Sequence, residues 1–572
     1  MRRKAELMGK MGAAGNVTIE FDVPAQMRDG VTLRANVYRP DGDGPWPTLL
    51  TRTPYWKDDL QGWLDPVQTA RRGFMVVVQD TRGRFASDGE WAPLRFERED
   101  GYDTVEWAAK LPGSNGRVGM YGCSYVGNTP WMAAVEQPPS LAAIAPGMTW
   151  SDPLDGIFAR GGALEFGGGP AWTLQMGIAH LLRLPLSEQE RERSLVALLD
   201  DLDRLPTDGY WELPVHDLSV LRRHNSPELS ATRALEEPDL VARCRVAGEY
   251  ERVTVPSFHI GGWYDVVLQG VLDSYMAMAA LGRPARLIVG PWDHDEYAAD
   301  PIGELCFGSR ASRVGAPVYE HGDLNDEQLA WFRRYLVPVH ASEAEKPQAP
   351  VRIFVMGRNQ WRDEAAWPLE RARAERWFLG AEGALRPGAP DADAAPSEFT
   401  YDPADPVPTL GGHTVLPAAF PAGPFDQAPV EARPDVCVFT SEPLQHDLEV
   451  TGRVRMVLHA QSSAPSTDWV ARLCDVHPDG RSFNICDGIL RIERNADACQ
   501  QITIDLWSTC NVFLAGHRLR VHVTSSNFPR WDRNLNTGNQ REPRLQTARQ
   551  RIHHDTQRAS WIELPVVAGI GG

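Results

Sequence analysis

One serine of this chain stands where a strand-like run of residues changes into a helix-like one. Residues 117–123 are mostly apolar and contain glycines, and residues 125–135 continue with helical spacing. This pattern is typical of a nucleophile elbow, in which a tight turn strains the serine backbone and lifts the hydroxyl above a sheet edge. We predict that Ser124 attacks a carbonyl carbon. The alternative is an ordinary strand–helix junction, because Gly127 follows Ser124 by three residues and the usual spacing is two.

A serine hydroxyl is a weak nucleophile near neutral pH, so acyl transfer needs a histidine to take its proton and an acid to orient that histidine. In α/β-hydrolases the acid and then the histidine follow the serine, each in a loop after a strand. Asp265 and His294 meet this requirement, because each follows a glycine-containing turn after an apolar run. Asp293 and Asp295 flank His294, but sequence neighbours rarely reach the imidazole with the required geometry. We therefore predict a triad of Ser124, Asp265 and His294.

Other interpretations remain open for these two residues. Asp265 could instead cap the helix that is expected to follow it. Among the competing histidines, His259 lies within an apolar strand, which favours a buried core position. The pair His553 and His554 is predicted to lie on the surface.

The tetrahedral intermediate of acyl transfer also needs hydrogen-bond donors for its oxyanion. The residue after the nucleophile, Tyr125, supplies a backbone N–H group. Tyr55 lies in the loop after an early strand, where hydrolases of this fold place a second donor, and its phenol can donate. A half-buried aromatic role is the alternative for Tyr55. Cys123, beside the nucleophile, is expected to pack as a small apolar residue.

The elements that must position these residues alternate between strand and helix patterns, as an α/β fold requires. An antiparallel hairpin is expected over 17–38, and the continuous apolar run in 73–80 is typical of a strand covered on both faces. The expected strands of the sheet lie at 47–52, 73–80, 117–123, 141–145, 253–262 and 285–290. The expected helices lie at 101–109, 125–135, 266–281 and 324–336.

The alternation stops between residues 151 and 245, which we name the cap segment and expect to be helical. Its clearest helix is expected over 187–202, because Ser187 and Glu190 have the form of a capping box. Residues 346–572 instead show short alternating strands and Pro/Gly turns, which predicts an all-β sandwich or jelly roll. Its expected elements include strands at 351–355, 454–460 and 518–523 and a surface loop at 383–396. The predicted catalytic domain therefore comprises 1–150 and 246–345.

Composition excludes several classes of protein. The 572 residues are too many for one core, and the net charge of −18 disfavours binding to nucleic acid or anionic membranes. The N-terminus has no apolar signal region and no long apolar run occurs, so we expect a cytoplasmic protein without membrane partners. The eight cysteines are scattered, with no CxxC pair, which predicts reduced core thiols and neither a metal nor a cofactor. A homo-oligomer is possible.

Taken together, these motifs resemble the serine hydrolase family that includes cocaine esterase, X-prolyl dipeptidyl-peptidases, α-amino-acid ester hydrolases and glutaryl cephalosporin acylases. The likeness covers nearly the whole chain, and the three-residue glycine spacing is itself this family's form. The resemblance implies an α/β-hydrolase domain with an inserted helical cap and a C-terminal jelly roll. It also implies Ser124, Asp265 and His294 as the triad, with Tyr55 and Tyr125 as oxyanion donors. Its markers are Arg52–Tyr55, Asp80–Gly83, Gly122–Gly127, Gly261–Asp265, Gly290–His294, Tyr401–Pro403 through Gly411–Gly412, and Ser525–Arg530.

The same resemblance implies a substrate pocket, which would draw on Phe158, Trp172, Val267, Val415 and Leu416. These residues are apolar or aromatic. They favour a serine esterase, or an amidase, that takes small uncharged or aromatic acyl groups.

The α-amino-acid ester hydrolases carry acids two and three places after the triad aspartate, where this chain has Val267 and Leu268. That departure argues against an ammonium-bearing substrate. Glu165 is the nearest candidate to recognise a cation, although we expect it to be a solvated surface residue. The alternatives are an X-prolyl dipeptidyl-peptidase, an α-amino-acid ester hydrolase or cephalosporin acylase and, more remotely, a non-catalytic protein that binds through the jelly roll.

Overall fold

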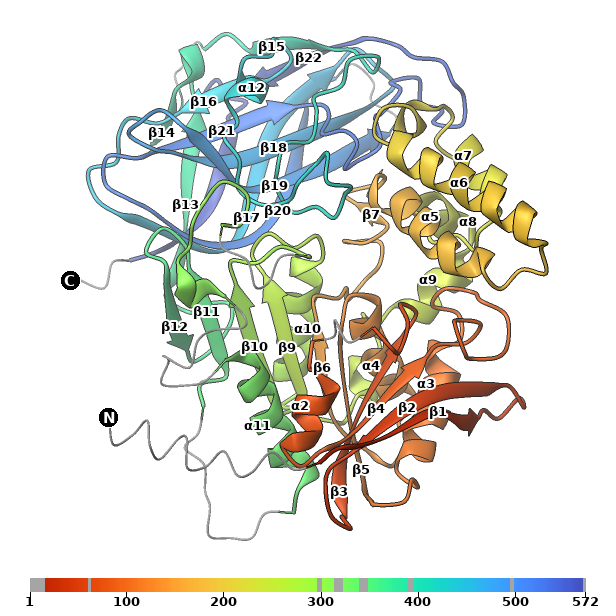
Figure 1. Cartoon of the computed structure of the whole chain (residues 1–572). Helices are drawn as coiled ribbons and strands as arrows, with labels where there is room; N and C mark the ends of the chain where they lie inside the picture. Colours follow the sequence, from red (N-terminus) through yellow and green to blue (C-terminus); the bar gives the residue numbers. More distant parts are fainter. Residues whose placement is uncertain are drawn as a thin grey trace.

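The computed structural model describes residues 16–59, 63–295, 301–312, 323–338, 348–388, 390, 394–493 and 498–568. Figure 1 shows a mixed sheet with flanking helices in the lower part of the molecule, an all-β domain above it and the helical cap segment at one side. No helix in these ranges is long and apolar enough to cross a membrane.

The lower part of the molecule is built on a sheet to which the described residues contribute ten strands. Its order is β1-β2-β4-β3-β5-β6-β9-β10-β11-β12, and the pairs from β4–β3 through β10–β11 are parallel. The strands are β1 (Thr18–Gln26), β2 (Thr32–Arg39), β3 (Trp46–Thr53), β4 (Met75–Asp80), β5 (Ser114–Cys123), β6 (Leu141–Gly147), β9 (Ser257–Gly262), β10 (Ala285–Gly290), β11 (Val351–Val355) and β12 (Gln360–Glu364). The α/β fold and the N-terminal hairpin β1–β2 are as predicted.

Helices cover both faces of this sheet. The residues of β4 are all buried, and they alternate between two cores, with Val76 and Val78 in one and Val77 in the other. The helices α3 and α4 pack in the core that contains Val77, and α2 and α11 pack in the opposite one. The helices are α2 (Pro66–Arg71), α3 (Glu97–Ala108), α4 (Tyr125–Glu136), α10 (Leu268–Ala280) and α11 (Leu324–Leu336). This two-sided cover explains the continuous apolar run of β4.

The strand at 351–355 corrects one predicted boundary. We assigned it to the C-terminal domain, but β11 pairs in parallel with β10, and β12 continues the same sheet to Glu364. The antiparallel edge strand β12 then leads into the all-β domain, so the α/β sheet extends past residue 345. Four of the five residues of β11 are apolar and buried, with Arg352 the exception, and this pattern could have indicated the larger sheet.

The cap segment is largely helical, as expected. Ser187 caps α6 with the predicted capping box, in which its hydroxyl accepts from the Glu190 N–H and the Glu190 carboxylate accepts from the Ser187 N–H. The short hairpin of β7 (Ala159–Arg160) and β8 (Ala163–Leu164) precedes the helices. These are α5 (Gly168–Leu181), α6 (Glu188–Arg204), η1 (Gly209–Trp211), α7 (Ser219–His224), α8 (Ala231–Glu236) and α9 (Pro238–Cys244), and η2 (Tyr250–Arg252) follows the segment.

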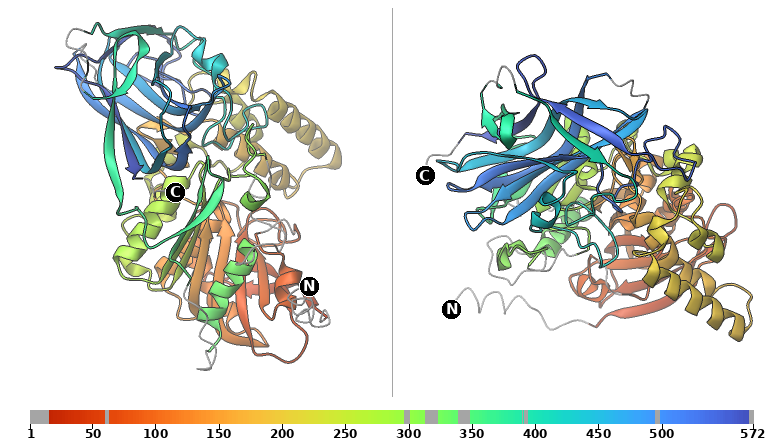
Figure 2. Two further views of the ribbon diagram at one scale, coloured as in Figure 1. Left: turned by 90° about the vertical axis from the view of Figure 1, so that its left-hand side faces the viewer. Right: turned by 90° about the horizontal axis from the view of Figure 1, so that it is seen from above.

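The C-terminal domain consists of antiparallel sheets that enclose a separate apolar core. Figure 2 shows it stacked on the end of the α/β sheet and beside the cap helices. Its strands are β13 (Ala372–Leu379), β14 (Leu385–Pro387), β15 (Ser397–Tyr401), β16 (Cys437–Thr440), β17 (Leu448–Ser462), β18 (Ser466–Val476), β19 (Ser482–Glu493), β20 (Gln500–Phe513), β21 (Arg518–Thr524), β22 (Ala548–His553) and β23 (Trp561–Val567). Its short helices are η4 (Ala381–Gly383) and α12 (Ala428–Glu431), whereas η3 (Ser309–Ala311) precedes the domain.

Three further sequence predictions can be compared with the fold. The loop expected at 383–396 contains the strand β14, and residues 389 and 391–393 lie outside the described ranges. The surface position expected for His553 and His554 is wrong, because both are buried, with exposures of 5% and 1%. His553 ends β22 and pairs with His459 of β17, and the His554 ring packs against Phe439. All eight cysteines are free thiols, and Cys306 and Cys499 among them are exposed, so the core position expected for the thiols does not hold for these two.

Candidate active site

Ser124 occupies a strained turn between β5 and α4. Its φ and ψ are +59° and −124°, a region that residues with a side chain rarely adopt and that costs about 1–3 kcal/mol. The turn needs close backbone contacts, since a Cβ on Gly122 would lie 2.4 Å from the Val126 carbonyl oxygen and one on Gly127 would lie 2.5 Å from the Gly147 oxygen. Gly127 is therefore the position at which α4 passes β6. This contact accounts physically for the unusual glycine spacing.

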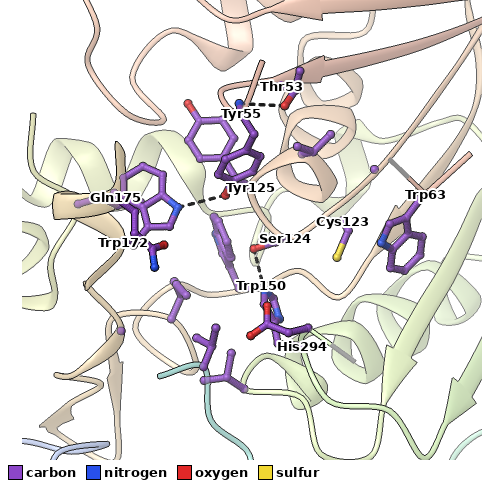
Figure 3. A pocket seen from close by; sticks show the side chains of 18 of the residues that line it. Thr53, Tyr55, Trp63, Cys123, Ser124, Tyr125, Trp150, Trp172, Gln175 and His294 are labelled. Atoms are coloured by element: carbon purple, nitrogen blue, oxygen red, sulfur yellow. Dashed lines mark hydrogen bonds between the residues drawn. The ribbon is translucent and has the colours of Figure 1, made fainter. Parts of the chain in front are cut away.

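The structure brings Ser124, His294 and Asp265 into one hydrogen-bonded chain, of which Figure 3 shows the contact between Ser124 and His294. The Ser124 Oγ lies 2.9 Å from His294 Nε2, and His294 Nδ1 lies 2.9 Å from Asp265 Oδ1. Asp265 follows β9 and His294 follows β10, so the parallel strands deliver both to the edge where Ser124 emerges. Asp265 is fully buried and also accepts the Val267 N–H at 3.0 Å, which fixes its carboxylate. The chain can move a proton from the serine to the imidazole.

The charges around His294 favour its protonated form. Burial lowers its pKa, but the Asp265 carboxylate and, more weakly, Asp295 and Asp293 outweigh this effect and raise the pKa to about 9. Asp293 accepts the Asp295 N–H at 3.0 Å. An imidazolium that forms when the serine gives up its proton is therefore stabilised at this position.

The competing histidine is held in the core. His259 is 1% exposed, its Nε2 lies 2.8 Å from Ser257 Oγ, and its ring packs between Trp131 and Tyr275. Burial lowers its pKa to about 3, so it stays neutral near pH 7. Its core position is as predicted.

Tyr55 presents its hydroxyl to the cavity beside Ser124. The Trp172 indole N–H donates to the Tyr55 hydroxyl oxygen at 3.1 Å, which leaves the phenolic hydrogen available for another acceptor (Figure 3). The Thr53 hydroxyl accepts the Tyr55 backbone N–H at 3.0 Å. Burial raises the pKa of Tyr55 to about 12, so the phenol remains protonated.

The side chain of Tyr125 is engaged elsewhere. Its hydroxyl donates to Glu97 Oε1 at 2.7 Å and accepts the Leu94 N–H at 2.9 Å. Only its backbone N–H, at the first residue of α4, remains as a candidate oxyanion donor. First-turn N–H groups of a helix have no partner within the helix, and they carry its positive dipole end.

Ser124 lines a cavity of about 500 Å³. Phe158, Trp172, Val415 and Leu416, which the family resemblance implies for a substrate pocket, line this cavity. Val267 is buried and does not belong to the lining, whereas its neighbour Val266 does. The sequence could not separate them, because the turn between β9 and α10 decides which of two adjacent valines faces the cavity. Further lining residues that were not predicted are Thr51, Trp63, Leu64, Cys123, Trp150, Gln175 and Arg530.

The solvated position expected for Glu165 is wrong. Glu165 is 6% exposed, lines the cavity and accepts the Trp531 indole N–H at 2.7 Å. The Arg530 Nε lies 3.5 Å from its Oε2. Burial raises the pKa of Glu165, and the nearby arginines oppose that rise. Both partners come from the C-terminal domain, more than 350 positions away, so no local pattern could reveal the pairing.

One group of side chains elsewhere could ligate a metal ion. Asp475, His477 and His517 offer ligand atoms that all lie within 4.8 Å of one another. They belong to the C-terminal domain, and none of them lines the cavity.

Comparison with known proteins matches two family models to this chain. The model for X-Pro dipeptidyl-peptidase (S15 family) covers residues 29–296, and that for the X-Pro dipeptidyl-peptidase C-terminal non-catalytic domain covers residues 343–563. Cocaine esterase of Rhodococcus sp. is 35% identical over 97% of this chain and 99% of its own length. A putative serine esterase of Mycobacterium bovis is 26% identical over 95% and 94%.

Among solved structures, an α-amino acid ester hydrolase has a TM-score of 0.78 and 25% identity over 97% of each chain. An aminopeptidase from a Thaumarchaeota archaeon has a TM-score of 0.77 and 23% identity over 97% of each chain, which shows the shared fold.

The fold and these relatives define the protein as a serine hydrolase with an α/β sheet and an all-β C-terminal domain. The chain belongs to the X-Pro dipeptidyl-peptidase (S15) family, in the group that includes cocaine esterase.

Proposed function

We propose that the chain is a serine carboxylesterase whose catalytic triad is Ser124, His294 and Asp265. The observation that carries this proposal is the continuous chain of two 2.9 Å hydrogen-bond distances from Ser124 to Asp265, which opens into the cavity. The strained serine backbone supports it, since such strain concentrates at functional sites.

In this mechanism the Ser124 oxygen attacks the ester carbonyl carbon while His294 Nε2 takes its proton. Asp265 holds the imidazole in the required orientation and stabilises its positive charge. The carbonyl oxygen becomes an oxyanion, and we assign its two donors to the Tyr55 hydroxyl and the Tyr125 backbone N–H. His294 then protonates the leaving alcohol, and an acyl group remains on Ser124. A water molecule, deprotonated by His294, attacks this acyl-enzyme and releases the acid.

The walls of the cavity favour small acyl or aromatic groups. Trp150, Phe158 and Trp172 offer ring faces, and Val415 and Leu416 add aliphatic surface from the C-terminal domain. Cocaine esterase, the 35% identical relative, bears the name of an ester substrate with an aromatic acyl group, which agrees with this lining. We also propose that the C-terminal sheets form a jelly roll and that residues 151–245 act as a cap over the cavity.

The family model also names an X-Pro dipeptidyl-peptidase, and this is the second candidate function. A panel of neutral p-nitrophenyl esters, aminoacyl esters and X-Pro amides distinguishes the candidates. We expect the neutral esters to have the highest kcat/KM, and their hydrolysis to disappear in Ser124→Ala. Preference for the X-Pro amides would replace the esterase by the peptidase, and preference for aminoacyl esters would indicate an α-amino-acid ester hydrolase.

A further inference from the structure

Two side chains of opposite charge face the cavity from one wall. Glu165 follows β8 of the cap segment, and Arg530 lies in the loop after β21 of the C-terminal domain. They are 6% and 1% exposed, and a β-bridge between Glu165 and Trp531 joins their segments. The mechanism proposed above uses neither of them.

Each of the two charges already has partners. Arg530 Nη1 donates to Asp487 Oδ1 at 2.7 Å, and its Nε lies 3.5 Å from Glu165 Oε2. The Trp531 indole N–H fixes the other Glu165 oxygen at 2.7 Å. Arg530 Nη2 also donates to Glu165 Oε1 at 3.5 Å, and the Arg530 Nε, which makes no hydrogen bond within the described residues, is itself buried.

A second arginine and a second acid complete a charge cluster, which we define as Arg160, Glu165, Asp487 and Arg530. Arg160 Nη1 lies 3.8 Å from Asp487, and its guanidinium stacks on the Trp507 ring at 3.7 Å. The cluster thus holds two cations and two anions. Lys57, which also lines the cavity, already pairs with Asp22 at 2.8 Å.

The balance of this cluster has a consequence for substrates. A buried ion without a counter-charge is strongly unfavourable, and removing one member of a buried pair leaves such an ion behind. While Glu165 neutralises Arg530, a substrate carboxylate placed here meets no uncompensated cation, and a substrate ammonium meets no uncompensated anion. A neutral group meets neither penalty.

We propose that Glu165 is the specificity-determining residue that makes this cavity reject carboxylate-bearing esters, by cancelling the charge of Arg530. The inference rests on the proposed esterase function and names its substrate class: esters whose group at this wall is neutral. Loss of the Glu165 charge would leave Arg530 in excess and turn the same wall into a carboxylate site.

The test compares kcat/KM of the full chain and of Glu165→Gln on two matched pairs of esters. One pair carries the charge on the acyl side, 4-nitrophenyl pentanoate against mono(4-nitrophenyl) succinate. The other carries it on the leaving group, methyl 4-acetoxybenzoate against 4-acetoxybenzoate. Glutamine keeps the oxygen that accepts from Trp531, so the wall keeps its shape. We expect the charged-to-neutral ratio of kcat/KM to rise at least tenfold in one pair.

Glu442→Gln is the matched control, because it removes one negative charge from a side chain that is 97% exposed. Its ratios should equal those of the wild type, and it should unfold at the wild-type temperature, whereas Glu165→Gln should unfold at a lower temperature because Arg530 loses a buried counter-charge. If the charged-to-neutral ratios of Glu165→Gln stay within twofold of the wild type in both pairs while neutral esters are still hydrolysed, the proposed role of Glu165 is wrong and the esterase function is unaffected. Failure of the unaltered protein to hydrolyse any ester instead contradicts the proposed function.

Should Glu165→Gln not fold, Arg530→Lys provides the second test. This variant keeps the positive charge, so the wild-type ratios should persist, and a tenfold change in either ratio would contradict the proposal.

Discussion

Trp172 of the cap segment donates its indole N–H to the hydroxyl oxygen of Tyr55, in the loop after β3, across 3.1 Å. This bond aims the phenol toward the serine, because it occupies one side of the oxygen and leaves the hydrogen for an acceptor. The cap segment therefore takes part in positioning a group that we assign to the chemistry, in addition to enclosing the substrate.

Tyr55→Phe should lower kcat by roughly 100- to 1000-fold, since loss of one oxyanion donor costs about 2.7–4 kcal/mol. The ring is kept, so thermal unfolding should hardly change. Trp172→Phe removes the hydrogen bond that aims the phenol and also reduces a ring that lines the cavity, but it keeps the phenolic donor, so we expect a smaller loss of kcat for that variant. Steady-state kinetics on one neutral ester measures both. A Tyr55→Phe enzyme within threefold of the wild type would show that the second donor lies elsewhere.

Ser124→Ala should abolish turnover and labelling by a fluorophosphonate, while its circular dichroism spectrum stays that of the wild type. Cys123 lines the same cavity, so Cys123→Ala is the matched control and should be labelled at the wild-type rate. Mass spectrometry of the labelled peptide identifies the residue that carries the label. A label that persists in Ser124→Ala would refute this serine as the nucleophile.

The pH profile should report His294, which must be neutral to accept the serine proton. Because its pKa is raised to about 9, the neutral fraction grows with pH, and kcat/KM should rise about tenfold per unit below that value and level off above it. Asp295→Asn removes one of the charges that raise this pKa, so the inflection should move to lower pH. The Glu442→Gln control should leave it in place. An inflection that did not move would show that the Asp295 charge does not act on His294.

The valines and leucine after Asp265 give a prediction for stability. Leu268 is fully buried in an apolar cluster that also contains Trp263 and Val271, and it is absent from the cavity lining. Leu268→Ala should therefore lower the free energy of unfolding by about 2–5 kcal/mol. Val266→Ala should instead enlarge the cavity and change KM for bulky acyl groups. Urea denaturation and kinetics separate the two effects. If Leu268→Ala altered KM more than stability, its placement in the core would be wrong.

The same packing revises how the sequence bears on ammonium substrates. Acids at 267 and 268 would be buried in apolar surroundings, so the double change Val267→Glu with Leu268→Asp should unfold the protein without creating an ammonium site. The absence of acids there still agrees with a neutral substrate, but for a different reason: neither side chain reaches the cavity.

The sequence predicts what depends on local pattern. The periodicity of β4 and α11, the capping box of α6 and the order of Ser124, Asp265 and His294 are all encoded in neighbouring residues, and the structure has these elements close to the predicted bounds. The pairing of Glu165 with Arg530 depends on how the cap segment folds against the C-terminal domain, and no single stretch of the sequence encodes that contact. The assignment of β11 failed for a related reason, because its partner β10 is separated from it by more than sixty positions.

The wall to which we assign substrate selection and the triad that we propose for ester cleavage come from different parts of the chain. Ser124, Asp265 and His294 follow strands of the α/β sheet, whereas Val415, Leu416 and Arg530 arrive from a domain with its own core. Substitutions in that second core can therefore alter which esters are accepted while the proton path stays intact. Such an arrangement lets relatives diverge in substrate while they retain one chemistry.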